Sequence, residues 1–122
     1  MNDILGRTGP WLDEASVLDL LHTSRGELEG MLERQELLRA EFADGTVLYP
    51  LWQFADARVV PGLRDVLQLL LKEGASMDGC ILWLSSAGED GNAMWWNLRM
   101  GRLPLVLRSA EIALEHRKQR SR

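Results

Sequence analysis

The feature that most constrains the fold is a pair of short helices separated by a tight turn. Apolar residues recur at helical spacing in "EASVLDLL" and again in "SRGELEGMLERQEL", and "HTS" joins the two stretches. Asp13 is a good N-cap for the first helix. Ser24, followed three residues later by Glu27, forms a capping-box signature for the second. Two helices joined by so short a turn predict a helix-turn-helix.

A hairpin is predicted directly after these helices. Beyond Leu37 the apolar pattern changes, and "LRAEF" and "TVLY" flank Asp44–Gly45, a dipeptide that favours a tight hairpin turn. Pro50 ends the second strand, because proline lacks an amide proton for the ladder. Residues 11–49 are therefore predicted to form a winged helix-turn-helix with a two-stranded wing.

The remainder of the chain is predicted to be helical. Residues 50–60 are expected to be an irregular connection, and residues 61–118 a four-helix half. These helices are expected to begin with Pro61 in a first turn, after Ser76 and Asn92 as caps, and after Pro104. The last helix repeats apolar residues on one face, namely Val106, Leu107, Ala110, Ala113 and Leu114. The predicted fold class is mainly α.

Composition narrows the location and class of the protein. With 122 residues, 46% of them hydrophobic, the chain fits one small domain or two mini-domains that share a core. A single cysteine, Cys80, excludes an intramolecular disulfide and a thiolate zinc site, which favours the cytoplasm, and it predicts a small buried side chain. The N-terminus lacks a signal-peptide pattern and no run of about 18 apolar residues occurs. We therefore expect a soluble, untargeted chain with no membrane contact.

Enzymatic patterns are missing from the sequence. His22 and His116 have no spaced cysteine or carboxylate partner that would form a metal site. "GEDG" lacks the Lys-Ser/Thr of a phosphate-binding loop, and no motif surrounds a serine nucleophile. We therefore expect a protein that is not an enzyme and uses no cofactor or metal.

The second predicted helix carries mixed signals for DNA binding. Side chains that suit phosphates and base edges are Ser24, Arg25, Arg34, Gln35 and, at the base of the wing, Arg39. The same stretch also carries four glutamates, and the chain has a net charge of -4. Two interpretations are open. A dimer places the arginines on phosphates while the glutamates stay clear of the backbone, or the winged fold has lost DNA binding and the acidic helix is simply solvated.

A protein interface is predicted around two adjacent tryptophans. Trp95 and Trp96 cannot both face one core, because neighbours on a helix point about 100° apart. Tryptophan and arginine are enriched at binding hot spots, so we predict a partner-binding surface at Trp95, Trp96, Arg99 and Arg102. The alternative is that the loop "AGEDG" and the winged half bury both tryptophans.

Two families resemble the two halves. "WLDEASVLDLLHTSRGELEGMLERQEL" with its hairpin resembles the winged helix-turn-helix of excisionase and MerR-type DNA-binding proteins. The second half is similar to Xre/MbcA/ParS-type antitoxins and related actinobacterial winged-helix regulators. The residues that match the motifs of this second family are Tyr49, Pro50, Gln53, Phe54, Pro61, Gly62, Leu63, Trp83, Leu84, Leu98, Gly101 and Val106.

The resemblance implies an antitoxin-type transcription regulator. The C-terminal half would bind and block a toxin-like protein, and the winged half would bind operator double-stranded DNA as a homodimer. The stretch "SSAGEDGNAMWW" departs from the family, which has prolines in this toxin-binding loop. The competing interpretations are a stand-alone winged-helix regulator, whose helical half only dimerises, and a degenerate winged fold that mediates only protein–protein interaction.

Overall fold

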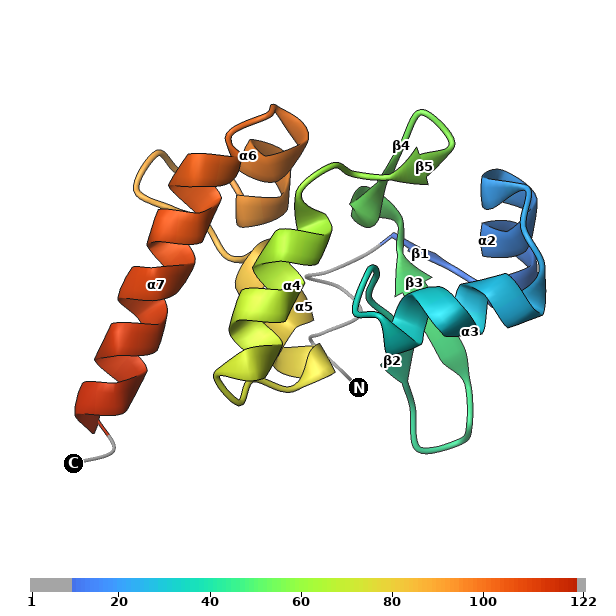
Figure 1. Cartoon of the computed structure of the whole chain (residues 1–122), viewed down its shortest axis with the longest axis horizontal. Helices are drawn as coiled ribbons and strands as arrows, with labels where there is room; N and C mark the ends of the chain where they lie inside the picture. The colour runs from blue at the N-terminus through green and yellow to red at the C-terminus, as the bar shows by residue number, and fades with distance from the viewer. Residues whose placement is uncertain (1–9, 121–122) are drawn as a thin grey trace.

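A computed structural model describes residues 10–120 of the chain and shows a mainly helical protein with small antiparallel sheets (Figure 1). The expected fold class, mainly α, is confirmed at this level. The N-terminal segment in which we looked for a signal peptide lies almost wholly outside the described residues. The elements are β1 (Trp11–Leu12), α2 (Glu14–Leu21), α3 (Arg25–Glu33), β2 (Ala40–Glu41), β3 (Val47–Pro50), η1 (Leu51–Gln53), β4 (Phe54–Ala55), β5 (Arg58–Val59), α4 (Leu63–Lys72), α5 (Met77–Ser85), α6 (Met94–Arg99) and α7 (Leu103–Arg120).

Helices α2 and α3 begin where their capping residues predict. The Asp13 carboxylate accepts a hydrogen bond from the Ser16 amide at 2.9 Å, and the Ser24 hydroxyl accepts one from the Glu27 amide at 3.2 Å. Each bond satisfies an amide that has no partner within its own helix. The Glu27 carboxylate accepts a hydrogen bond from the Thr23 hydroxyl, instead of from the Ser24 amide expected in a capping box. The two N-caps are therefore confirmed.

The two strands that follow α3 join β1 in a three-stranded antiparallel sheet with the order β1-β3-β2. Ala40 pairs with Leu48 in the predicted hairpin, which turns at Gly45 with a φ of +89°. The third strand, β1, was not predicted, because two residues are too short to show the alternation of a strand. It lies on the other side of β3, where Trp11 pairs with Pro50.

The expectation of an irregular connection over residues 50–60 was wrong. Pro50 is the last residue of β3, a single turn of 3-10 helix follows as η1, and β4 and β5 then form a second small hairpin in which Phe54 pairs with Val59. Asp56 and Ala57 make its turn with φ values of 54° and 61°. Such turns usually contain glycine or asparagine, so the "DA" dipeptide gave no turn signal.

Three of the predicted helix starts in the second half need correction. Helix α7 begins at Leu103, one residue before Pro104, and not after that proline. Helix α4 begins at Leu63 after Gly62, whose φ is +91°, so Pro61 lies outside the first turn. Ala93, not Asn92, is the N-cap residue of α6, because the Asn92 amides donate to the Asp90 carboxylate within the preceding loop. The Ser76 cap of α5 is confirmed, since its hydroxyl accepts a hydrogen bond from the Gly79 amide at 3.0 Å.

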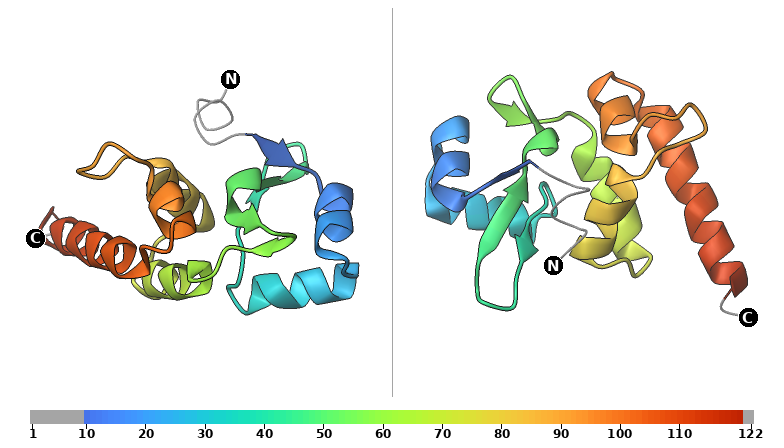
Figure 2. Two further views of the ribbon diagram at one scale, coloured as in Figure 1. Left: turned by 90° about the horizontal axis from the view of Figure 1, so that it is seen from above. Right: turned by 180° about the vertical axis from the view of Figure 1, so that it is seen from behind.

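The helices of the second half pack around one large core (Figure 2). Helix α7 packs against α4 and α6, with Val106, Ala110 and Leu114 buried. Cys80 is fully buried as predicted, and its burial raises the pKa of the thiol to about 11. Among residues 10–120, no helix combines the length and apolar character that crossing a lipid bilayer requires.

The two halves share their cores and have no flexible linker between them. A smaller cluster contains Val17, Leu28 and Tyr49, whereas Leu38 and Trp52 from the first half belong to the large cluster of the second. The buried Gln53 side chain bonds both backbone groups of Leu38. Its Oε1 accepts from the Leu38 amide and its Nε2 donates to the Leu38 carbonyl, each at 2.7 Å.

Candidate nucleic-acid interface

The turn between α2 and α3 has a defined backbone geometry. His22 adopts the left-handed region with a φ of 52°, and its amide bonds the carbonyls of Asp19 and Leu18. The Thr23 amide also donates to the Leu18 carbonyl, at 3.1 Å. This arrangement satisfies the last carbonyls of α2 and starts α3 only three residues later. Within residues 10–120, no group of three or more His, Cys, Asp or Glu side chains could hold a metal ion.

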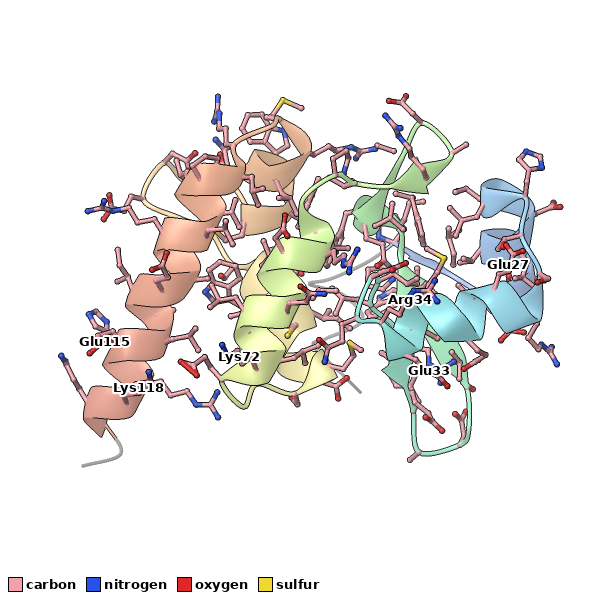
Figure 3. The ribbon with its side chains drawn as sticks, in the orientation of Figure 1. Glu27, Glu33, Arg34, Lys72, Glu115 and Lys118 are labelled. Carbon is pink, nitrogen blue, oxygen red and sulfur yellow. The ribbon has the colours of Figure 1, made fainter. Side chains whose placement is uncertain are left out.

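Helix α3 has one side on the core and one side outward. Leu28 is buried, and Met31 and Leu32 are half-buried beside it. Because each residue turns the helix by 100°, four positions lie along the middle of the outer side, namely Gly26, Glu29, Gly30 and Glu33. Arg25 and Arg34 lie at the two edges of this outer side. Figure 3 shows Glu27 at one end of the helix and Glu33 and Arg34 at the other.

Each arginine that we predicted for DNA binding makes an ion pair. Arg25 Nε lies 2.8 Å from Glu14 Oε1, and Arg34 Nε lies 2.8 Å from Glu36 Oε2. The third pair joins Arg39 Nη1 to Glu29 Oε1 at 3.1 Å. The structure therefore supplies each of these cations with a carboxylate of its own chain.

These ion pairs differ in which partner is the more exposed. The Arg25 side chain is 76% exposed and its partner Glu14 25%, and Arg34 is 58% exposed and its partner Glu36 22%. In the third pair the order is reversed, because Arg39 is 27% exposed and Glu29 47%. Exposed ion pairs contribute about 0–1 kcal/mol, because water and side-chain entropy offset most of the attraction. Arg25 and Arg34 can therefore exchange their carboxylates for another anion at little energetic loss.

The Arg34–Glu36 contact favours the charged form of both groups. The hydrogen bond from Arg34 lowers the pKa of the Glu36 carboxyl, and the bond to Glu36 raises the pKa of the Arg34 guanidinium. Both groups are therefore charged at neutral pH. An anion that approaches Arg34 must also approach the Glu36 carboxylate.

Charge is unevenly divided along the chain. Residues 10–60 contain ten carboxylates and four arginines, whereas residues 61–122 contain nine lysines and arginines and seven carboxylates. The first half therefore has a negative net charge and the second half a small positive one. A polyanion that binds the first half is attracted only by the arginines of that half.

The other two residues predicted for DNA have distinct places. Ser24 lies at the N-terminus of α3, where its hydroxyl already accepts the capping bond from the Glu27 amide. Gln35 lies beyond the end of α3, in the left-handed region with a φ of 59°, and is half-buried. Ser24 and Arg25 are thus together at one end of α3, and Arg34 and Gln35 at the other.

The four residues predicted to bind a protein partner contact other parts of the chain. Trp95 stacks on the buried Trp52, with ring centroids 6.2 Å apart and planes 10° apart. Arg99 Nη2 donates to the Phe54 carbonyl at 3.2 Å. The Arg102 guanidinium lies 5.2 Å from the centre of the Trp96 ring. Trp95 and Arg99 therefore join the two halves, and Arg102 covers Trp96.

The fold of this chain is similar to that of a known protein. No protein-family model matches the chain, and no curated protein matches it. A solved structure, the NMR structure of Rv2175c, superposes with a TM-score of 0.81 at 20% sequence identity, covering 93% of this chain and 86% of that one. At this identity the match shows that the two proteins share a fold.

Two features of α3 escaped the sequence analysis. Gly26 and Gly30 lie four residues apart on its outer side. A Cβ at Gly26 would have no heavy atom nearer than the Ser24 hydroxyl at 4.0 Å, so the glycine is not required by packing. At Gly30 the nearest atom is Arg34 Nη1 at 3.0 Å, so the Arg34 side chain folds back over this glycine. The spacing of four in a solvent-facing helix was the signal available in the sequence.

Proposed function

We propose that the protein is a DNA-binding transcription regulator that uses residues 11–49 as a winged helix-turn-helix. The observation that carries this proposal is the arrangement of its parts. Helices α2 and α3 meet at a three-residue turn, the β2–β3 hairpin follows directly, and β1 joins the other side of β3. This is the order expected of a winged domain, with α3 as the reading helix and the hairpin as the wing.

The dimensions of α3 suit the major groove of DNA. Arg25 and Arg34 are nine residues apart. At the rise of an α-helix this is about 13 Å, close to the groove width of about 12 Å. We propose that these two arginines contact phosphates at the groove edges, where each exchanges its glutamate for a phosphate.

The outer row of α3 supports close approach to the bases. Gly26 and Gly30 have no side chain to hold the helix backbone away from the groove. Glu33 is exposed, and a carboxylate accepts a hydrogen bond from the amino group of cytosine. An acidic reading helix is therefore compatible with DNA when its carboxylates meet base edges and its arginines meet phosphates.

The test is a binding curve on selected DNA at several salt concentrations. Duplexes enriched from a random pool by the protein are titrated by fluorescence anisotropy with the wild type, with Arg25→Ala/Arg34→Ala, and with Arg58→Ala as matched control. Arg58 is exposed in the same half, on the separate hairpin β4–β5. We expect the double variant to lower the salt slope by about 2, one for each lost phosphate contact, and the control to bind like the wild type.

A second candidate function is protein recognition by a winged fold that does not bind DNA. The pairing of Arg25, Arg34 and Arg39 with glutamates favours it, as does the excess of carboxylates in the first half. If this second function holds, the protein should enrich no duplex from the random pool and should cause no anisotropy change at low salt. A toxin-like partner is supported only by the resemblance of residues 49–106 to antitoxins, so we propose the regulator without one.

A further inference from the structure

Helix α7 has a second apolar stripe that the fold leaves uncovered. Its inner side buries Val106, Ala110 and Leu114. On the opposite side, Leu105 is 43% exposed and Ile112 is 50% exposed. These two residues are seven apart, so they lie one above the other along the helix. Large aliphatic side chains aligned in this way provide an apolar surface that a second helix can cover.

The stripe forms one wall of a groove. Leu105, Ser109 and Ile112 line it from α7, and the half-buried Trp83 and the loop of residues 86–90 line it from the other side. The groove has a volume of about 880 Å³. Figure 2 shows the loop between α5 and α6 projecting beside α7. A second hollow of about 380 Å³ adjoins Trp83 and reaches Gly79 and Arg117.

The charges beside the stripe suit a second copy of α7. Helical rotation places Arg108, Glu111 and Glu115 along one edge of it. Within residues 10–120 neither Arg108 nor Glu111 makes an ion pair. When two identical helices pack antiparallel, the same edge of each faces the other. A two-fold axis beside Ser109 then sets Leu105 against Ile112 of the second copy, and Arg108 against Glu111 of the second copy.

In a parallel arrangement the charged edges of the two helices would lie on opposite sides of the contact, so Arg108 could not pair with Glu111 of the second copy. The stripe is thus self-complementary in one orientation, which is the requirement for a closed two-fold dimer. Ser109, a small residue, lies where the two helices cross and allows them to approach. We propose that the protein forms a homodimer through an antiparallel contact of the α7 helices at Leu105, Arg108, Glu111 and Ile112. This inference does not depend on DNA binding.

The first experiment measures mass in solution without DNA. Sedimentation equilibrium of the full chain across the micromolar range should give twice the 13.8 kDa of one chain. Ile112→Glu should give the mass of one chain. Leu51→Glu is the matched control, since Leu51 is 37% exposed but lies in η1, and it should remain a dimer. Circular dichroism should show equal helix content in all three proteins, because both side chains are exposed.

The second experiment tests the orientation by exchanging charges. Arg108→Glu and Glu111→Arg should each weaken the dimer about five- to tenfold, because each change repels twice across the two-fold axis. The double variant should restore the wild-type dissociation constant. A wild type that sediments as one chain throughout, an Ile112→Glu variant as dimeric as the wild type, or a double variant weaker than both singles would overturn the proposal. Each result stands whether or not the protein binds DNA.

Discussion

The two halves of the molecule are stabilised in different ways. In the second half, four helices supply most of the residues of the large apolar core. In the first half, α2, α3 and a short sheet enclose a small cluster, and Leu38, Ala40 and Trp52 lie in the core of the second half. The half with the acidic outer helix therefore depends on its neighbour for stability. Residues 10–120 therefore share one joined core, although the sequence pattern divides them into a winged half and a helical half.

The largest expected effects come from the two cores themselves. Leu67→Ala in the second half and Leu28→Ala in the first both remove fully buried side chains, and each should lower the free energy of unfolding by about 3 kcal/mol. Because the cores are joined, urea unfolding followed by tryptophan fluorescence and by circular dichroism should give one shared transition in both variants. Separate transitions for the two probes in Leu28→Ala would show that the first half unfolds alone.

The junction between the halves should give the next largest effect. Gln53→Ala leaves the buried amide and carbonyl of Leu38 without the two hydrogen bonds that Gln53 makes. We expect a loss of about 2 kcal/mol, measured by urea unfolding. Gln53→Glu keeps an acceptor for the amide and loses the donor to the carbonyl unless it is protonated. Its deficit should therefore shrink as the pH falls, and a deficit independent of pH would contradict this role of the side-chain amide.

Ser24 and Ser76 are N-caps at equivalent positions, one in each half, so their variants can be compared directly. Ser24→Ala and Ser76→Ala each remove a hydroxyl that accepts one helix amide, at 3.2 Å and 3.0 Å. Each should lower stability by about 1 kcal/mol in thermal unfolding. Only Ser24→Ala should also weaken DNA binding, since Ser24 begins α3. Equal DNA affinity in the two variants would remove Ser24 from the interface.

The smallest expected effect is a gain in stability. Glycine inside a helix is less favourable than alanine, and the Cβ of Gly30→Ala meets only the flexible Arg34 guanidinium. We expect the free energy of unfolding to rise by about 0.5 kcal/mol. DNA affinity should fall, because the new methyl group separates α3 from the groove and displaces Arg34. Gly26→Ala, on the same side of α3 but with more space, tests whether both glycines matter.

Features that depend on residues close in the sequence were predicted correctly, whereas contacts between distant residues were not. The caps at Asp13, Ser24 and Ser76 depend on amides three residues away, so the sequence reveals them. Asn92 was misassigned, because the nearby Asp90 carboxylate competes for its amides. Contacts between distant residues leave no periodic pattern.

The candidate site shows the same division. Ser24, Arg25 and Arg34 could be placed on α3 from spacing alone, and the structure has them at its two ends. The Arg25–Glu14 pair joins residues on different helices, so the spacing along one helix could not reveal it. The apolar stripe of α7 was visible in the spacing of Leu105 and Ile112, but its exposure depends on which side of α7 the core occupies.

The pairing of Trp11 with Pro50 has a consequence for synthesis of the chain. A ribosome makes β1 early, but the strand that it joins appears only after α2, α3 and β2 are complete. Helices can form from local contacts while the chain is still growing, whereas this sheet must wait for its central strand. Once Pro50 has emerged, η1 follows at once, and Gln53 at its end bonds back to Leu38. The nascent first half thus acquires its sheet and its attachment point for the second half at nearly the same moment of translation.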